Sequence, residues 1–140
     1  MKSLTALRLV AGLHAVAICL QPVFAGLYLN GSGAAMRMHE PTGLALTFTG
    51  LLQLLIATIW WRNGGRLLAP VVTLLITLGE VVQIAMGYSR QLAIHIPLGI
   101  ALVGTAVAFA LWTTRQRPTT RQRGTTRRRG TADQPAEVQA

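Results

Sequence analysis

The segment Leu92–Trp112 reads LAIHIPLGIALVGTAVAFALW and contains no Asp, Glu, Lys or Arg. A helix needs about 20 consecutive apolar residues to cross the hydrocarbon core of a membrane, and this segment supplies that length. Residues 7–29, 42–61 and 67–88 have the same apolar character, and short polar breaks separate them. Backbone groups without partners are not tolerated in lipid, so each segment is expected to be a helix. We therefore predict an all-α membrane protein, a four-transmembrane-helix bundle spanning residues 1–112.

The composition agrees with a chain solvated by lipid. Hydrophobic residues make up 51% of the 140 residues and charged residues only 12%, whereas about a quarter of a soluble domain is charged. The thirteen Lys and Arg residues against four Asp and Glu would suit a nucleic-acid partner, but they gather at the ends of the apolar segments. We therefore interpret the charge as membrane topology and regard nucleic acid as an unlikely partner. Cys19 is the single cysteine, which excludes an intramolecular disulfide and a thiolate metal cluster.

Basic residues also predict the orientation, because Lys and Arg accumulate on the cytoplasmic side of a membrane. One side would carry Lys2, Arg8, Arg62, Arg66 and the seven arginines that follow Trp112. The other side would carry only Arg37 and Arg90. This distribution places both termini in the cytoplasm.

The two ends of the chain allow further expectations. Residues 1–25 could instead be a cleaved signal peptide, since a basic start and an apolar core precede Val23-Phe24-Ala25. Residues 113–140 repeat Thr and Arg and cannot bury a core, so we predict a disordered cytoplasmic tail attracted to anionic lipids. RNA binding and phosphorylation of its threonines are alternatives for the tail. The Arg-rich, Lys-poor composition indicates a bacterial source and hence the bacterial plasma membrane.

One motif occurs twice. His39-Glu40-Pro41-Thr42-Gly43 and His95-Ile96-Pro97-Leu98-Gly99 both follow the pattern H-x-P-x-G. Each is preceded by a glutamine, by a Gly and Tyr that close the previous apolar segment, and by an arginine. The repetition predicts two tandem helical hairpins related by an axis along the membrane normal.

In such a repeat the two histidines would lie at equal depth and could face each other across the axis. One b-type haem could then be held between the second and fourth helices, with His39 and His95 as ligands of the iron. Gly43 and Gly99 lie one helical turn beyond the histidines and would give room for the macrocycle. Arg37 and Arg90 could pair with the haem propionates.

Ordinary packing explains the same motif. Proline is favoured in the first turn of a helix, and glycine is common where membrane helices touch. His14 has no counterpart in the repeat and is expected to form a hydrogen bond inside the bundle. Zinc is not supported, because the usual spacings of His and Cys ligands are missing.

Glu80 is an ionisable residue within an apolar segment, which usually indicates a functional path or a buried partner. Thr73, Thr77, Glu80 and Gln83 share one helical face, and so do Thr47, Gly50, Gln53 and Ala57 on the second helix. Both faces are expected to point into the bundle. We predict a buried polar network of Gln21, Glu80 and Gln83, in which Glu80 either relays protons or orients a histidine.

The paired H-x-P-x-G motifs, the glutamines and the four short spans over about residues 7–112 resemble small bacterial four-helix membrane proteins of unassigned function. They are more distantly similar to the four-helix bundles of cytochrome b and haem A synthase. That resemblance implies His39 and His95 as axial ligands of a b-type haem for electron transfer. It does not imply electron transfer across the membrane or haem modification, and an enzyme activity is not expected. The alternative is a cofactor-free structural or accessory subunit that packs against a membrane protein partner or a second copy of itself.

Overall fold

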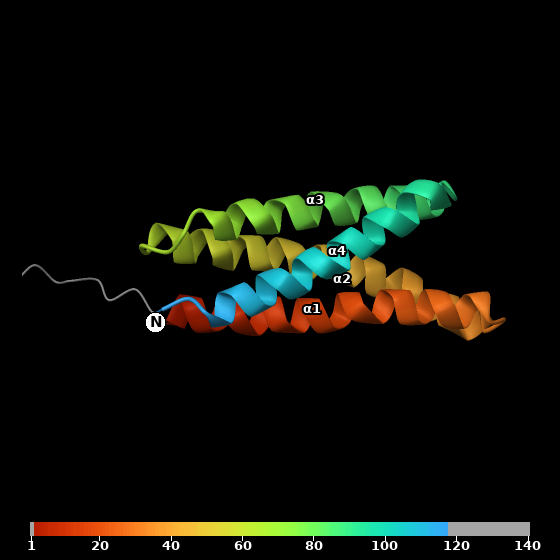
Figure 1. Cartoon of the computed structure of the whole chain (residues 1–140), viewed down its shortest axis with the longest axis horizontal. Helices are drawn as coiled ribbons and strands as arrows, with labels where there is room; N and C mark the ends of the chain where they lie inside the picture. The colour runs from red at the N-terminus through yellow and green to blue at the C-terminus, as the bar shows by residue number, and fades with distance from the viewer. Residues whose placement is uncertain (1, 118–140) are drawn as a thin grey trace, which may run out of the picture.

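The computed structural model describes residues 2–117 and consists of four antiparallel helices (Figure 1). They are α1 (Lys2–Leu29), α2 (Gly33–Arg62), α3 (Leu68–Tyr88) and α4 (Leu92–Thr114). All four are long and apolar enough to cross a membrane, which is consistent with an integral membrane protein. The predicted four-helix bundle is confirmed. Residues 118–140, most of the predicted tail, lie outside the described residues.

The helices form a closed ring of neighbours. The chain runs α1 to α2 to α3 to α4, and α4 also packs against α1, so that α1 faces α3 and α2 faces α4 across the centre. In Figure 1, α4 runs obliquely from the end of α3 to the start of α1. Side chains from the two diagonal pairs therefore meet along the axis of the bundle.

Two helix boundaries differ from the sequence prediction. We expected the first helix to begin near residue 7 and the second near residue 42, but they begin at Lys2 and Gly33. Pro41 is consequently inside α2 and does not start it. A proline removes one hydrogen bond from a helix, and membrane helices tolerate that loss where neighbouring groups compensate. Ala34, Ala35 and Met36 favour helix, which explains the longer start of α2.

The three turns between helices share one capping geometry. The second residue after each of these helix ends has a positive φ: Gly31 (94°), Gly64 (92°) and Arg90 (56°). In each turn the next N–H donates to a carbonyl five residues back, as in Ser32 to Leu27 at 3.0 Å. This is the Schellman arrangement, in which glycine is the usual residue. Arg90 adopts the same backbone without being a glycine.

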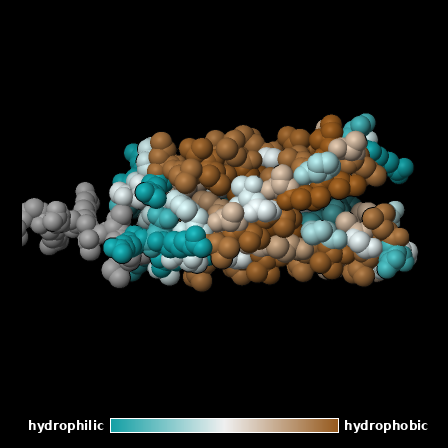
Figure 2. Space-filling view, in the orientation of Figure 1, coloured by the Kyte–Doolittle hydropathy of each residue, from teal (hydrophilic) through white to brown (hydrophobic). Residues whose placement is uncertain are grey.

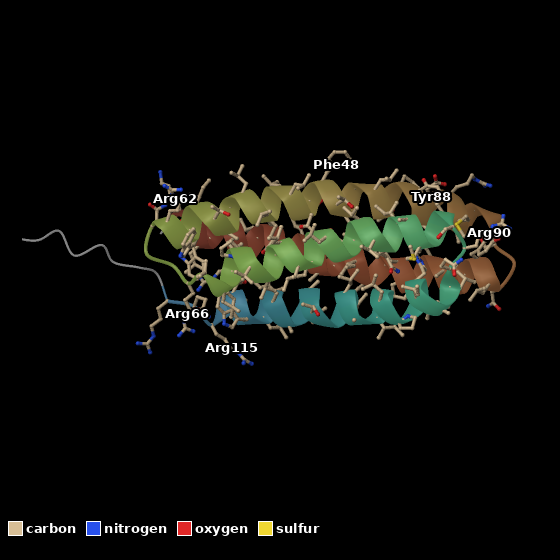
Figure 3. All side chains as sticks on the ribbon, turned by 90° about the horizontal axis from the view of Figure 1, so that it is seen from above. Phe48, Arg62, Arg66, Tyr88, Arg90 and Arg115 are labelled. Carbon is tan, nitrogen blue, oxygen red and sulfur yellow. The ribbon has the colours of Figure 1, made fainter. Side chains whose placement is uncertain are left out.

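The surface separates into an apolar belt and two polar ends (Figure 2). Large apolar side chains such as Leu13, Phe48, Leu75 and Ile100 are exposed around the bundle. Figure 3 shows Arg62, Arg66 and Arg115 at one end, called here the basic end, and Tyr88 and Arg90 at the opposite end, called here the far end. The belt is suited to contact with lipid.

The interior near the basic end is apolar and aromatic. Leu7, Ala57 and Ala69 have no exposed surface, and Trp60 is 2% exposed. Trp112 packs edge-on against Trp60 and stacks on Phe109. Trp60 lies inside the bundle, where it faces α4.

Arg8 joins the beginning of the chain to the end of α4. Its guanidinium donates to the backbone oxygens of Thr113 (3.1 Å), Thr114 (3.2 Å) and Gln116 (2.5 Å). The last carbonyls of a helix have no partners within the helix, and their partial negative charge favours a cation. Arg8 therefore caps α4.

Candidate functional site

Polar side chains line the axis of the bundle from its middle to the far end. The two small and polar faces predicted on α2 and α3 point inward: Gly50, Gln53, Thr73, Thr77 and Glu80 are all buried. On α3 this polar face extends from Thr73 to Gln83, about 15 Å at 1.5 Å per residue. We call this inward-facing set the polar column. It consists of His14, Gln53, Thr73, Thr77 and Glu80, together with Gln21, Gln83, His39 and His95 near the far end.

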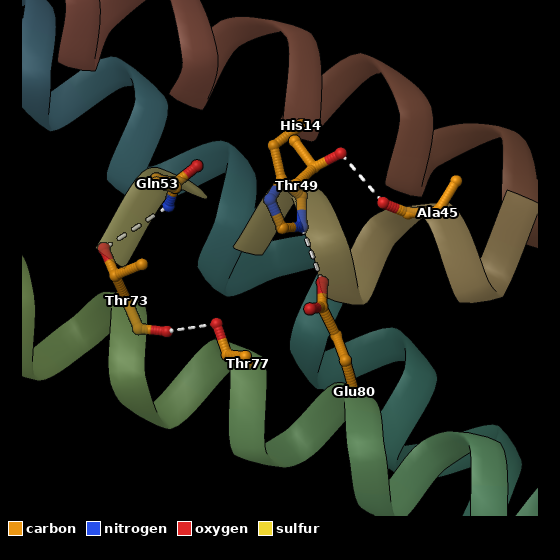
Figure 4. Close-up of polar contacts among 7 residues, drawn as sticks. All are labelled: His14, Ala45, Thr49, Gln53, Thr73, Thr77 and Glu80. Carbon is orange, nitrogen blue, oxygen red and sulfur yellow. Dashed lines mark hydrogen bonds and ion pairs between the residues drawn. The ribbon is translucent and has the colours of Figure 1, made fainter. Parts of the chain in front are cut away.

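The centre of the polar column is a contact between His14 and Glu80 (Figure 4). His14 Nε2 lies 2.6 Å from Glu80 Oε1, and the two side chains are only 1% and 5% exposed. The pair spans the diagonal from α1 to α3. The hydrogen-bonding role expected for His14 is therefore present, whereas Glu80 contacts His14 in place of the predicted Gln21 and Gln83.

Each partner keeps one buried polar atom without a hydrogen bond among residues 2–117. These atoms are His14 Nδ1 and Glu80 Oε2. A buried polar atom without a partner costs free energy, and native proteins retain few of them. Nδ1 of His14 and Oε2 of Glu80 therefore have hydrogen-bonding capacity that the described residues do not use.

The repeated motif produces the same contact in both hairpins. His39 Nδ1 lies 3.2 Å from the backbone oxygen of Gln21, and His95 Nδ1 lies 2.9 Å from that of Gln83. In the second hairpin Gln83 Nε2 donates to the His95 carbonyl at 2.7 Å. In the first, the Gln21 amide with its nitrogen toward His39 donates to the His39 carbonyl at 3.2 Å. Each glutamine therefore joins its helix to the following histidine.

The glycines of the motif make room for these glutamines. A Cβ at Gly99 would lie 2.7 Å from Gln83 Nε2, so only glycine lets the amide reach the His95 carbonyl. A Cβ at Gly43 would lie 3.8 Å from the Gln21 amide, an ordinary contact, so the need for glycine is confined to Gly99. The space that we assigned to a macrocycle beside Gly99 is thus taken by a side chain of the protein.

The geometry of His39 and His95 bears on their predicted role as ligands of a haem iron. Their ring centroids are 6.2 Å apart with planes 56° apart. A metal held at about 2.0–2.1 Å by two imidazole nitrogens would separate the centroids by about 6.3 Å. Backbone carbonyls at both Nδ1 atoms are the outer-shell partners that metal-binding histidines usually have.

The surroundings of the histidines do not suit the macrocycle. Gln83 fills the space beside Gly99, and a Cβ at Gly87 would lie 3.1 Å from His95 Cε1, so α3 is packed against that ring. Arg37 and Arg90 are exposed at the far end. The separation of the two rings is compatible with one iron, but the packing around them leaves no room for a porphyrin beside Gly99.

Two other observations concern the surroundings of the site. Tyr88 donates a hydrogen bond to Glu40, which joins the end of α3 to α2 at an exposed position. Within residues 2–117, no group of three or more His, Cys, Asp or Glu side chains is placed to hold a metal ion. Inside the described bundle the histidines instead lie in two pairs: His39 with His95, and His14 with Glu80.

The His14–Glu80 pair was not predicted, although the sequence contains a signal for it. His14 follows the first residue of α1 by twelve positions, and Glu80 follows the first residue of α3 by twelve positions. At 1.5 Å per residue both lie about 18 Å from the basic end. The sequence prediction missed this match because it placed Glu80 by its distance from the far end of its helix.

No known protein family, curated protein or solved structure matches this chain.

Proposed function

We propose that this chain is a multi-pass membrane protein that takes up and releases protons at the buried His14–Glu80 pair. The observation that carries the proposal is the 2.6 Å contact between two ionisable side chains that are almost fully buried. Ionisable residues inside a membrane are costly and usually have a functional reason. A purely structural contact between α1 and α3 could be made by apolar side chains at lower cost.

The pair can hold zero, one or two exchangeable protons. With one proton its net charge is zero, and this is the form that is cheapest to bury. Losing that proton leaves a net charge of −1 and gaining a second leaves +1. Each change places an uncompensated charge in the bundle, so proton binding is coupled to the stability of the contact between α1 and α3.

Protons are expected to reach the pair from the far end. The polar column continues from Glu80 through Gln83 to the two histidines, whereas Leu7, Ala57 and Trp60 close the interior toward the basic end. Hydrogen-bonding groups support proton movement and a packed apolar layer does not. The protein therefore exchanges protons with one side of the membrane and does not conduct them across it.

The orientation is part of the proposal. Lys2, Arg62, Arg66 and Arg115 lie at the basic end, and Arg37 and Arg90 lie at the far end. The excess of basic residues supports a cytoplasmic location for the basic end and for both termini. The equivalent contacts of Gln21 with His39 and of Gln83 with His95 support the tandem hairpins. The far end then faces outward from the bacterial plasma membrane.

A proton titration tests the function directly. Protein purified in detergent is titrated in parallel with the Glu80→Gln variant, and the difference in bound protons is recorded against pH. We expect the wild type to bind up to one proton per chain more than Glu80→Gln. In His14→Leu the Glu80 carboxyl is still present, so this variant should keep the proton that Glu80→Gln loses. Glu40→Gln is the matched control, since Glu40 is exposed and its removal changes only the titration of a surface carboxyl. Identical titrations of the wild type and Glu80→Gln would refute the proposal.

Haem binding by His39 and His95 is the second candidate: the 6.2 Å spacing of the rings suits two ligands of one iron, but Gln83 would have to leave the space beside Gly99. The test is a visible spectrum of protein from haem-supplied cells, oxidised and reduced, beside His39→Ala and His95→Ala. A Soret band lost in both variants would establish ligation by two histidines. A colourless folded protein would leave a cofactor-free membrane protein, acting alone or as an accessory subunit.

A further inference from the structure

The turn between α2 and α3 presents two arginines that make no contact with other charged groups of the chain. Arg62 and Arg66 are exposed at the basic end (Figure 3). Neither forms an ion pair or a side-chain hydrogen bond within residues 2–117. Arg8 differs from them, because its guanidinium is bound to the backbone carbonyls at the end of α4. The charges of Arg62 and Arg66 can therefore serve a partner outside the chain.

The backbone of this turn is held in place by the interior of the bundle. The Gly65 N–H donates to the Trp60 carbonyl at 3.0 Å. A Cβ at Gly65 would lie 2.5 Å from Trp60 Cδ2, so the turn packs directly on the buried indole. Arg62 and Arg66 lie on either side of this packed segment. A fixed backbone lowers the entropy that the two arginines lose when they bind a partner.

No acidic residue among residues 2–117 neutralises the basic end. The carboxyl groups in this range belong to Glu40 and Glu80. Glu40 accepts a hydrogen bond from Tyr88 at the far end, and Glu80 is buried in the middle of the bundle. Lys2 and Arg115 are exposed and add to the positive charge around the turn. Such a concentration of one charge attracts anions.

Exposed apolar side chains adjoin the two arginines. Trp61 precedes Arg62, and Leu67 and Leu68 follow Arg66; all three apolar residues are exposed. They lie where the apolar belt borders the basic end (Figure 2). A phospholipid matches both features, because it carries an anionic phosphate and apolar acyl chains. A nucleic acid or a free phosphate would match only the charge.

We propose that the α2–α3 turn binds the headgroup of an anionic phospholipid. Arg62 and Arg66 bind the phosphate, and Leu67 and Leu68 lie along the acyl chains. Guanidinium groups form charge-assisted hydrogen bonds with phosphate oxygens. Each basic residue at an anionic membrane surface contributes about fivefold in affinity. The inference is independent of proton exchange in the polar column, so either can fail without the other.

The test measures lipid-specific stabilisation of the full chain in detergent. Protein is titrated with phosphatidylglycerol or with phosphatidylcholine, the melting temperature is recorded, and native mass spectrometry reports the retained lipid. We expect phosphatidylglycerol to stabilise the wild type more, and its affinity to fall about 25-fold in Arg62→Gln/Arg66→Gln. Arg37→Gln/Arg90→Gln removes the same charge from the far end and should keep the wild-type affinity. Residues 118–140 are the same in every variant, so their own attraction to lipid cancels in the comparison.

Further arms of the experiment identify the partner. Glycerol 1-phosphate carries the headgroup charge without acyl chains; if it stabilises the protein as well as phosphatidylglycerol does, the partner is a soluble phosphate and the proposal is overturned. Leu67→Ser should weaken binding of phosphatidylglycerol. The single variants Arg62→Gln and Arg66→Gln, each expected to lose about fivefold, keep the test decisive if the double variant does not fold. Equal stabilisation by the two lipids, or equal losses in the two double variants, would also overturn the proposal.

Discussion

Replacing Gly50 with alanine tests the packing at the centre of the polar column. The new Cβ would lie 2.7 Å from Thr77 Oγ1 and 2.8 Å from Glu80 Oε2, and real Cβ atoms do not approach oxygen so closely. The Thr77 hydroxyl is held by its bond to the Thr73 carbonyl, so the carboxyl of Glu80 has to move. That movement weakens the contact with His14 Nε2.

The magnitude follows from two opposed effects. Inserting a methyl group into a packed core costs about 1–3 kcal/mol. Alanine in a helix interior is more favourable than glycine by about 0.5–1 kcal/mol. We therefore expect Gly50→Ala to lower the free energy of unfolding by about 1–2 kcal/mol, with a further cost if the His14–Glu80 contact is lost.

The assay is equilibrium unfolding in mixed micelles, followed by circular dichroism, with Gly104→Ala as the control. Gly104 is also in a helix, and a Cβ there would meet nothing within 4 Å, so the control should be as stable as the wild type or more stable. A Thr77→Ala background should reduce the cost at Gly50, because one of the two close oxygens is removed. If Gly50→Ala and Gly104→Ala are equally stable, the packing described around Glu80 is incorrect.

Three further substitutions have definite expected outcomes. Gly99→Ala displaces the glutamine amide 2.7 Å away and should cost about 1–2 kcal/mol of unfolding free energy, whereas Gly43→Ala, with its nearest atom at 3.8 Å, should be neutral in the same unfolding assay. Arg8→Ala removes the cap of α4 and should increase amide hydrogen exchange in its last turn, with unchanged exchange in α3 as the reference. Arg90→Gly should stabilise the protein by about 1 kcal/mol, since a left-handed backbone costs a non-glycine residue about that much; an unchanged melting temperature would contradict the φ of 56°.

Much of the fold could be predicted because membrane spans depend on local composition. The four helices, the inward faces of α2 and α3 and the meeting of His39 with His95 follow from apolar length and helical spacing. The predicted start of α2 was wrong because Pro41 was treated as a first-turn residue. A proline inside a helix leaves one backbone carbonyl without its hydrogen bond, and a helix bundle can compensate for that loss.

The centre of the site was harder to predict because it depends on relations between helices. Whether Glu80 meets His14 or Gln83 is decided by the axial register of α1 against α3, and no short motif encodes it. The role of Gly99 likewise depends on a residue of another helix, because Gln83 fills the space that the missing side chain leaves. The roles of Glu80 and of the two histidines stay predictions until the titration and the spectrum are measured.

The cap that Arg8 places on α4 links the first helix to be synthesised with the last. While the ribosome is still making α2 and α3, the guanidinium has no backbone carbonyls of Thr113 and Thr114 to bind. The hydrogen bonds of Arg8 thus form only after a segment about a hundred residues later in the chain has been made. A nascent chain stalled before α4 would display an unpaired arginine beside an open bundle, a state that cellular quality control could distinguish from the finished protein.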